Sequence, residues 1–540
     1  MTDILLIQPP LHDFYLTAKR TMPYGLAMIA AALRRKHFSV AILDALATPK
    51  TRVLPWPEEF EHLRPYYGRA DASPFGLFHR FRRFGYSEEH IALLARDSGA
   101  FLIGISSLFT AYADSALQIA AAVRRALPQA VIVMGGHHPT ALPEAVMQHP
   151  AVDYVLRGDG EAGLPLLAQS IREGRPPQDI PGLVHRLPEG GLRIATPVYC
   201  HDLEKLPPPA LDLIDARHYR RAGRYCLTLC ATRGCSLRCT YCAVNASDGQ
   251  GLRRRSVSAV IQEIAAACRD RPVGFIDFED EHLGAERRWF RELLRQLHLH
   301  FGQYAPELRA MNGLFAPSLD EETLQAMKQA GFKTLNLALV TTCAKQLRRF
   351  RRPDVRGDFD RVLAIAERCG LTAVAYVIVA GPGQSPEQGV DDLLFLAERR
   401  VLAGVSVFYP APGSFDYSWC SQQGLLPDGF AGMRATALPI THRTDRTQTV
   451  TLLRLGRMLN FVKSLIDAGQ LLPEPQSAPP RLTLANGRER IGQTLLAAFL
   501  KDGRIRGVDE AGEVYAHTID AALARRFLDG LRHRRLRGVT

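Results

Sequence analysis

Residues Thr232 to Val244 read T-R-G-C-S-L-R-C-T-Y-C-A-V and bring Cys235, Cys239 and Cys242 close together in the chain. A short apolar segment, Leu227 to Leu229, precedes them, so we expect the thiols on a loop at the carboxyl end of a strand. Iron–sulfur clusters usually take four cysteines, whereas three thiolates at this spacing can leave one iron of a cubane cluster open. The pattern favours a catalytic site with a vacant coordination position over a closed structural one.

Two other origins could explain this spacing. With ten cysteines in 540 residues, a C-x3-C-x2-C run would arise by chance roughly 0.003 times per chain. The structural alternative is a zinc knot that takes Cys226 or Cys230 as its fourth thiolate. Zinc sites usually show two separated ligand pairs, and no second pair follows downstream.

The bulk composition is that of an ordinary globular protein of two to four domains, with 46% hydrophobic and 23% charged residues. No apolar run is long enough to span a bilayer. The first residues, Met1 to Ile7, lack the basic region and cleavage site of a signal peptide and are typical of a first strand. We therefore expect a cytoplasmic protein, in a compartment that keeps cysteines reduced.

The net charge of +12 comes mostly from arginine. Local runs occur at residues 253–255, 348–352 and 532–535. Nucleic acid, an acidic lipid surface or a phosphorylated substrate would each explain them. Solvated surface faces explain them equally well, so we do not expect nucleic-acid binding.

The first part of the chain alternates strands and helices, which predicts a doubly wound, Rossmann-like α/β sheet over residues 1–195. Strands are expected at 4–8, 40–44, 101–106, 131–134 and 154–157, with helices at 25–35 and 113–127. Ligands of such sheets bind at the carboxyl ends of the strands, where Ser106-Ser107-Leu108 and Gly135-Gly136 lie. An aromatic-rich insertion at 47–98, with spacing compatible with an amphipathic helix, is either a lid or a packed surface excursion.

A proline-rich linker is expected at 196–220, followed over 221–430 by six strand–helix repeats that form a partial (β/α)6 barrel. The strands are expected at 227–231, 274–279, 308–312, 334–339, 373–379 and 404–408. Capping boxes begin helices at Ser318 and Ser385, and glycines end two others at Gly331 and Gly370. Residues 431–540 are predicted to form a long helix near 449–468 and a small α+β tail.

The cysteine run resembles the cluster loop of the radical S-adenosylmethionine (SAM) superfamily. The loops after the amino-terminal strands are similar to those of cobalamin-binding domains, so the chain resembles the cobalamin-dependent (class B) radical SAM proteins. The resemblance implies three cofactors: a 4Fe-4S cluster, SAM and cobalamin. It assigns the cluster to Cys235, Cys239 and Cys242, the SAM site to Tyr241, Glu279, Asn312 and Gly381, and the cobalamin site to Ser106, Leu108, Gly135 and Gly136.

The sequence departs from the family pattern at several places. The usual cobalt-ligating histidine motif is absent after the first strand, so His12 is either a displaced ligand or the lower cobalt face is covered by side chains that do not ligate. Gln384 stands where relatives have a glutamate. Glu281 and His282 are either substrate contacts or a solvated strand end.

The implied activity is methylation of an unactivated carbon, or of phosphorus, through a 5′-deoxyadenosyl radical and methylcobalamin. A cyclase or oxidoreductase without net methyl transfer is the alternative. A methylthiotransferase acting on RNA would need amino-terminal cluster cysteines, and the first cysteine here is Cys200. A cobalamin-binding sensor or carrier that does no chemistry is a further alternative. The expected partners are a small-molecule or peptide substrate and a reductant such as flavodoxin or ferredoxin.

Overall fold

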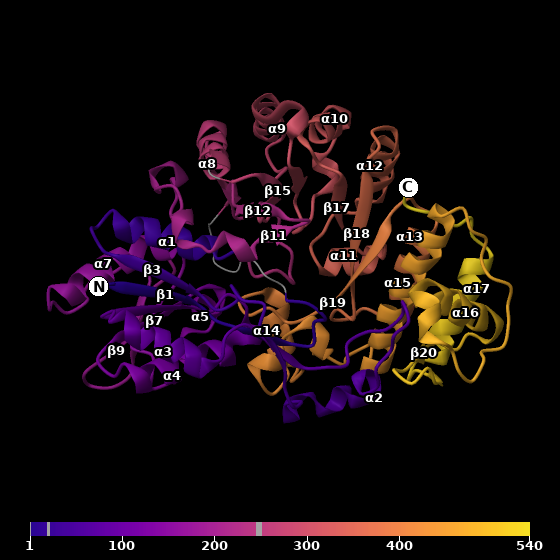
Figure 1. Ribbon diagram of the computed structural model, residues 1–540, viewed down its shortest axis with the longest axis horizontal. Helices are drawn as coiled ribbons and strands as arrows, with labels where there is room; N and C mark the ends of the chain where they lie inside the picture. Colours follow the sequence, from indigo (N-terminus) through magenta and orange to yellow (C-terminus); the bar gives the residue numbers. More distant parts are fainter. Residues whose placement is uncertain (1, 19–21, 245–250, 270) are drawn as a thin grey trace.

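A computed structural model gives the structure of the protein for residues 2–18, 22–244, 251–269 and 271–540. Figure 1 shows an amino-terminal α/β domain beside an open barrel, with the carboxyl-terminal helices against the far side of the barrel. Within these ranges no helix combines the length and the apolar character needed to cross a bilayer.

The amino-terminal sheet has the order β10-β9-β8-β7-β6-β1-β3. The five strands expected from the sequence pair in parallel, and two further strands extend the edge in antiparallel orientation. The strands are β1 (Ile4–Gln8), β3 (Val40–Asp44), β6 (Leu102–Ser106), β7 (Val131–Gly135), β8 (Tyr154–Leu156), β9 (Leu183–Arg186) and β10 (Leu192–Ile194).

Helices cover both faces of this sheet, which confirms the doubly wound prediction. Leu5 and Ile7 of β1 belong to one core, with α3 (Glu88–Ser98) and α4 (Ala113–Ala126). Ile4 and Leu6 belong to the other, with α1 (Tyr24–Arg34) and α7 (Gly160–Arg172). Two short helices follow β7: α5 (His137–Ala141) and α6 (Pro143–Met147).

Six strands in chain order form the open barrel, as predicted. A continuous ladder joins β12, β15 and β16, and a second joins β17, β18 and β19. Single bridges, one between Leu314 and Leu337, connect the two ladders. The strands are β12 (Arg224–Leu229), β15 (Val273–Phe278), β16 (Glu307–Arg309), β17 (Thr334–Val340), β18 (Thr372–Val379) and β19 (Leu402–Val407); a short β11 (Arg220–Arg221) lies beside β12.

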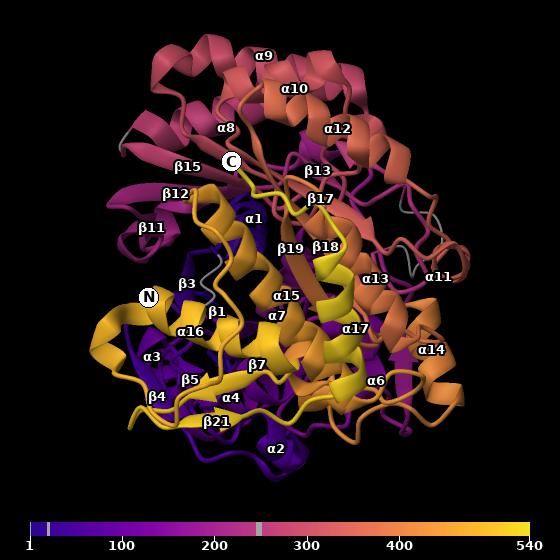
Figure 2. The ribbon, with the colours of Figure 1, turned by 90° about the vertical axis from the view of Figure 1, so that its right-hand side faces the viewer.

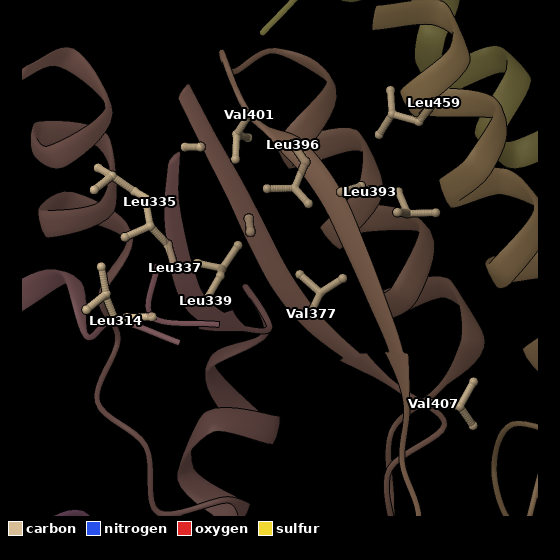
Figure 3. Packing of buried hydrophobic residues seen from close by; sticks show 14 of the residues in the cluster. Leu314, Leu335, Leu337, Leu339, Val377, Leu393, Leu396, Val401, Val407 and Leu459 are labelled. Carbon is tan, nitrogen blue, oxygen red and sulfur yellow. The ribbon is translucent and has the colours of Figure 1, made fainter. Parts of the chain in front are cut away.

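The barrel core lies between the strands and the outer helices (Figure 3). Buried and half-buried residues alternate along β18, so Val377 packs outward against the helices. The outer helices are α8 (Val257–Arg269), α9 (Arg287–Phe301), α10 (Glu321–Ala330), α12 (Arg356–Arg368) and α13 (Pro386–Ala397). The long helix α15 (Arg446–Asp467) covers β19, where the Asn460 side chain pairs with both backbone groups of Ala403 at 2.8 Å.

Two helix starts test the capping predictions. The box at Ser385 is present, and the Ser385 amide donates to Gln388 Oε1. The box at Ser318 is wrong, because the Ser318 hydroxyl donates to the Phe315 carbonyl and α10 begins only at Glu321. Asp320 caps that helix by accepting from the Thr323 amide at 3.0 Å.

The 47–98 insertion packs against the carboxyl-terminal region, so the packed alternative describes it better than a lid. The aromatic-rich part, residues 56–84, contains one α-helix, the short α2 (Arg64–Tyr67), and not a long amphipathic helix of the kind its spacing allows. Its strands β4 (Thr51–Val53) and β5 (Arg82–Phe84) form a sheet with β2 (Leu11–Asp13). Tyr67 and Phe75 are fully buried, and Arg454 of α15 donates to the Phe75 carbonyl.

The tail has the predicted helix–hairpin–helix order: α16 (Gly487–Asp502), β20 (Arg506–Val508), β21 (Val514–Ala516) and α17 (Ala521–Arg532). Figure 2 shows α16 and α17 beside α15. The limits 1–195, 196–220, 221–430 and 431–540 stay predictions.

Asp71 fastens the insertion to this tail and offers a stability test. Its carboxylate accepts from His517 at 2.8 Å and from the Ser73 and Val508 amides, and it is buried. Asp71→Ala leaves these partners unpaired and should lower the free energy of unfolding by about 3 kcal/mol in urea titrations. Asp391→Ala removes an exposed ion pair with Arg526 and should cost under about 1 kcal/mol. Equal effects would contradict the assignment.

Candidate active site

The three cysteines lie on the loop after β12, as expected. Each thiol is half-buried and free, and the Cys235 sulfur accepts from the Leu237 amide at 3.4 Å. Burial raises the pKa of Cys242 to about 11, and the Cys239 and Cys235 thiols act in the same direction. Three thiolates this close repel one another, and bound iron would relieve that repulsion. The donor set therefore fits a metal cluster.

The residues that follow β15 organise this loop. The Asp280 carboxylate accepts from the Ala231 amide at 3.2 Å and from the Thr232 amide and hydroxyl at 2.6 Å. Glu281 accepts from the Gly234 amide at 3.0 Å. Asp280 is buried, and burial raises its pKa to about 7. These contacts fix the backbone that leads into Cys235.

His282 completes the same set, with its Nδ1 atom 3.7 Å from the Cys235 sulfur. The sequence offered a substrate contact or a solvated strand end for Glu281 and His282. The solvated strand end is wrong, because His282 is buried and Glu281 binds the cysteine loop. The sequence signal that could have found this is the uninterrupted acidic run directly after a buried strand. The substrate contact stays a prediction.

Arg352 brings a positive charge to the second cysteine. Its Nη1 atom lies 3.7 Å from the Cys239 sulfur, and Nη2 donates to the Ala338 carbonyl. The guanidinium lies over the Phe315 ring and is almost fully buried. A buried cation at this distance can offset negative charge on the cysteine loop.

Tyr241 lies between the second and third cysteines and packs edge-on against Phe350, with ring centroids 5.0 Å apart. Its neighbour Thr240 anchors the loop, since the Thr240 hydroxyl donates to Asp416 at 2.7 Å. Asp416 also pairs with Arg349 at 2.9 Å. The arginine run at 348–352 therefore includes two residues that hold the cysteine loop and is not wholly a solvated face.

Glu279 and Asn312 meet at the carboxyl ends of neighbouring strands. The Asn312 amide donates to the Glu279 carbonyl at 3.0 Å and lies 3.4 Å from its Oε2 atom. Burial and the nearby Asp277 raise the pKa of Glu279. The structure thus brings together two of the four residues that the resemblance assigned to SAM, and their role stays a prediction.

Gly381 lies in the turn after β18. A Cβ there would lie 2.6 Å from the Phe350 ring, so any other residue would force that ring to shift. Gln384 spans the turn, because its Oε1 accepts from the Gly381 amide and its Nε2 donates to the Ile378 carbonyl. Gln384 is fully buried. It therefore shapes the turn from inside.

The zinc alternative needs Cys226 or Cys230 as a fourth thiolate, and Cys226 already has other partners. The Cys226 thiol donates to Asp277 at 3.1 Å, and Arg309 lies against both groups. In the part of the chain that the structure describes, no three His, Cys, Asp or Glu side chains surround a single ion position, and this includes Cys235, Cys239 and Cys242. In a cluster each of these cysteines would bind a different iron.

The cobalamin residues predicted from the sequence gather at the carboxyl edge of the amino-terminal sheet. Ser106 and Gly135 are register partners, and the Ser107 amide donates to the Gly135 carbonyl at 2.8 Å. Gly136 has φ +118°, and a Cβ there would lie 2.5 Å from the Ser107 carbonyl oxygen. Leu108 is half-exposed. The edge therefore presents close backbone and an apolar side chain to a bulky ligand.

Two buried polar atoms at this edge have no hydrogen-bond partner among the described residues: Ser107 Oγ and His138 Nε2. The Nδ1 atom of His138 lies 3.1 Å from the Thr110 hydroxyl. Unpaired buried polar atoms are costly, so they fit a site completed by a polar ligand. Sequence reasoning missed His138, although it closely follows Gly135-Gly136.

His12 is packed inside the protein. Its Nδ1 atom lies 3.2 Å from the Ser115 hydroxyl of α4, and Nε2 lies 3.6 Å from Glu88 of α3. Burial lowers the pKa of His12 to about 4. Both ring nitrogens face helices, which favours the alternative in which His12 is not a cobalt ligand.

The two domains are joined close to this edge. Asp13 is fully buried and pairs with Arg434 at 3.1 Å, and the Thr436 hydroxyl donates to Asp13 at 2.8 Å. The ring of His138 packs edge-on against Phe430, with centroids 4.8 Å apart. Residues that follow the barrel therefore hold the amino-terminal domain in place.

Comparisons with known proteins agree with this architecture. Residues 80–168 match the model of the B12 binding domain, and residues 229–396 match that of the radical SAM superfamily. The chain is similar to the cytidylyl-2-hydroxyethylphosphonate methyltransferase of Streptomyces wedmorensis, with 24% identity over 78% of this chain and 82% of the relative. It is also 28% identical to the anaerobic magnesium-protoporphyrin IX monomethyl ester cyclase of Rubrivivax gelatinosus, over 44% and 42% of the two chains.

Among solved structures, the cobalamin-dependent S-adenosylmethionine radical enzyme OxsB, with aqua-cobalamin and S-adenosylmethionine bound, shares the fold. The TM-score is 0.64 at 15% identity, covering 98% of this chain and 78% of that one. A B12-binding domain therefore precedes a radical SAM domain in this chain. This is the domain combination of the cobalamin-dependent radical SAM proteins that the sequence resembles.

Asp280→Ala tests the loop assignment. It removes the acceptor of three donors and should reduce the iron retained after anaerobic reconstitution at least severalfold, measured by iron analysis. Asp392→Ala is the matched control, because Asp392 also accepts from a threonine amide and hydroxyl, those of Thr342 at 2.6 Å, elsewhere in the barrel. Equal iron loss in both variants would show a general folding effect.

His138 makes a pH prediction for the cofactor-free protein. Burial lowers its pKa to about 4 from 6.5, so between these values the unfolded chain binds a proton that the folded chain does not. Stability should fall by about 2 kcal/mol from pH 7 to pH 5 through this residue. His138→Asn should flatten the pH dependence of the urea midpoint, whereas the surface variant His298→Gln should leave it unchanged. An unaltered slope in His138→Asn would contradict the assignment.

Proposed function

We propose that this protein is a cobalamin-dependent radical SAM methyltransferase that methylates an unactivated carbon, or a phosphorus centre, of its substrate. The observation that carries the proposal is the pairing of a three-cysteine loop with a B12-binding edge in one chain. The long match to a named phosphonate methyltransferase supports the methyl-transfer outcome.

In this proposal Cys235, Cys239 and Cys242 hold three irons of a 4Fe-4S cluster. Tyr241, Glu279, Asn312 and Gly381 form the SAM site, and Ser106, Leu108, Gly135 and Gly136 receive cobalamin. When bound, these groups supply radical generation and a transferable methyl group. An unactivated carbon is no nucleophile, which is why such chemistry is needed.

The residues of the chain position these groups and control their charge. Asp280 and Glu281 fix the backbone before Cys235, so the thiols are presented together. Arg352 offsets the negative charge that accumulates on the sulfurs. Glu279 offers a carboxylate to an ammonium group such as that of SAM, and its contact with Asn312 holds it at the barrel mouth.

We further propose a cytoplasmic protein that takes a small-molecule or peptide substrate and receives electrons from a flavodoxin or ferredoxin. The oxygen sensitivity expected of the cluster and the ten free cysteines support this setting.

A second candidate is a cobalamin-dependent radical SAM cyclase or oxidoreductase without net methyl transfer. The match to the magnesium-protoporphyrin cyclase favours it, but that match covers under half of each chain. Because the match to the methyltransferase is longer, the cyclase or oxidoreductase is the second candidate.

Isotope labelling separates the two. Anaerobically reconstituted enzyme is incubated with candidate substrates, a reductant, cobalamin and SAM carrying a labelled methyl group. We expect 5′-deoxyadenosine and a product that carries the label. Formation of 5′-deoxyadenosine with an unlabelled product would instead support the cyclase or oxidoreductase. Cys239→Ala should abolish 5′-deoxyadenosine, and full activity in that variant would refute the proposal.

A further inference from the structure

Two short paired strands close the base of the cysteine loop. Strand β13 (Thr232–Arg233) leads into the loop and β14 (Arg253–Arg254) leaves it, and the two pair in antiparallel register. Gly234 has φ +85°, and a Cβ there would lie 2.2 Å from the Gly251 carbonyl oxygen. Whatever holds this base therefore also fixes where the loop starts and ends.

Two arginines lie directly opposite each other at this base. Arg233 and Arg253 are register partners, and like charges in that position repel. Both reach the same carboxylate of the B12-binding domain: Asp159 Oδ2 lies 2.9 Å from Arg253 Nη1 and 3.3 Å from Arg233 Nη1. Arg233 also donates to Glu161 at 2.6 Å. Two carboxylates thus neutralise two arginines.

This set of four residues is poorly hydrated. The side chain of Glu161 is 4% exposed and that of Arg253 is 7% exposed. Asp159 also accepts from the Cys200 amide at 2.8 Å, and Arg253 donates to the Cys200 carbonyl. Buried, multiply bonded ion pairs are sensitive to geometry, because breaking one leaves an uncompensated charge.

The two carboxylates lie at the edge of the amino-terminal sheet where a ligand of that sheet would bind. Asp159 and Glu161 bracket the start of α7, directly after β8, at the carboxyl edge that also carries Gly135 and Gly136. Gly158 has φ +89°, and a Cβ there would lie 2.1 Å from the Val198 carbonyl oxygen, so this turn packs directly against the backbone at Val198. Ordering of the edge by a ligand would therefore be passed to the two carboxylates.

We propose that Asp159 and Glu161 are positioning residues that couple occupancy of the B12-binding edge to the geometry of the cysteine loop, through Arg233 and Arg253. The inference rests on the proposed function only in taking cobalamin as the ligand of that edge. It predicts reciprocal linkage: cobalamin should order the loop, and a loaded loop should tighten cobalamin binding by the same factor.

The test uses the full-length, cluster-free protein under anaerobic, reducing conditions. Alkylation of Cys235, Cys239 and Cys242 by iodoacetamide is followed by mass spectrometry with and without hydroxocobalamin, and Cys268 and Cys369 serve as internal references. In wild type, hydroxocobalamin should slow alkylation of the three thiols about fivefold or more. In the Asp159→Asn/Glu161→Gln double variant this protection should be lost, although hydroxocobalamin still binds.

Control variants separate coupling from general stability. Asp179→Asn removes an exposed pair with Arg193 in the same domain and should keep full protection. Glu161→Arg combined with Arg233→Glu should restore part of it. Retained protection in the double variant, or none in a wild type that binds hydroxocobalamin, would overturn the inference. If the double variant does not fold, Glu161→Gln alone decides, with partial loss expected. A wild type that binds no hydroxocobalamin would instead refute the proposed function.

Discussion

The site depends on hydrogen bonds that hold an irregular loop, because three thiols must be presented at fixed positions without a regular backbone ladder. The acceptors are the carboxylate pair after β15. Asp280 and Glu281 accept from the amides that lead into Cys235, and Asp280 is buried, where each such bond is costly to lose. The parallel strand order of the barrel brings the end of β15 beside the end of β12, so the fold itself delivers these acceptors.

Contacts between distant segments also fix the arrangement of the two domains. Residues after the barrel reach back to the amino-terminal sheet through Arg434 and Phe430, while Asp159 and Glu161 reach forward to the base of the cysteine loop. These contacts hold the carboxyl ends of the strands in the amino-terminal sheet and in the barrel at fixed positions relative to each other. Radical chemistry requires its reagents to be positioned and competing quenchers excluded, and this fixed arrangement suits that requirement.

Much of the fold could be predicted from the sequence because its signals are local. Alternating apolar strands, punctuated helices and the cysteine spacing marked both sheets and the loop. The wrong or open predictions involve contacts between distant segments or competing local hydrogen bonds. Ser318 looked like a cap, but the preceding turn uses its hydroxyl and Asp320 caps instead. The roles of Arg352 and His138 depend on segments that only the fold brings together, so no local pattern reveals them.

The central claim is that three cysteines leave one iron open for SAM. The most direct measurement is electron paramagnetic resonance of the anaerobically purified, reduced protein with and without SAM. The account predicts a 4Fe-4S signal that changes when SAM is added, because SAM binds the open iron. Oxygen-free protein that is colourless and without iron, or a cluster signal indifferent to SAM, would contradict it.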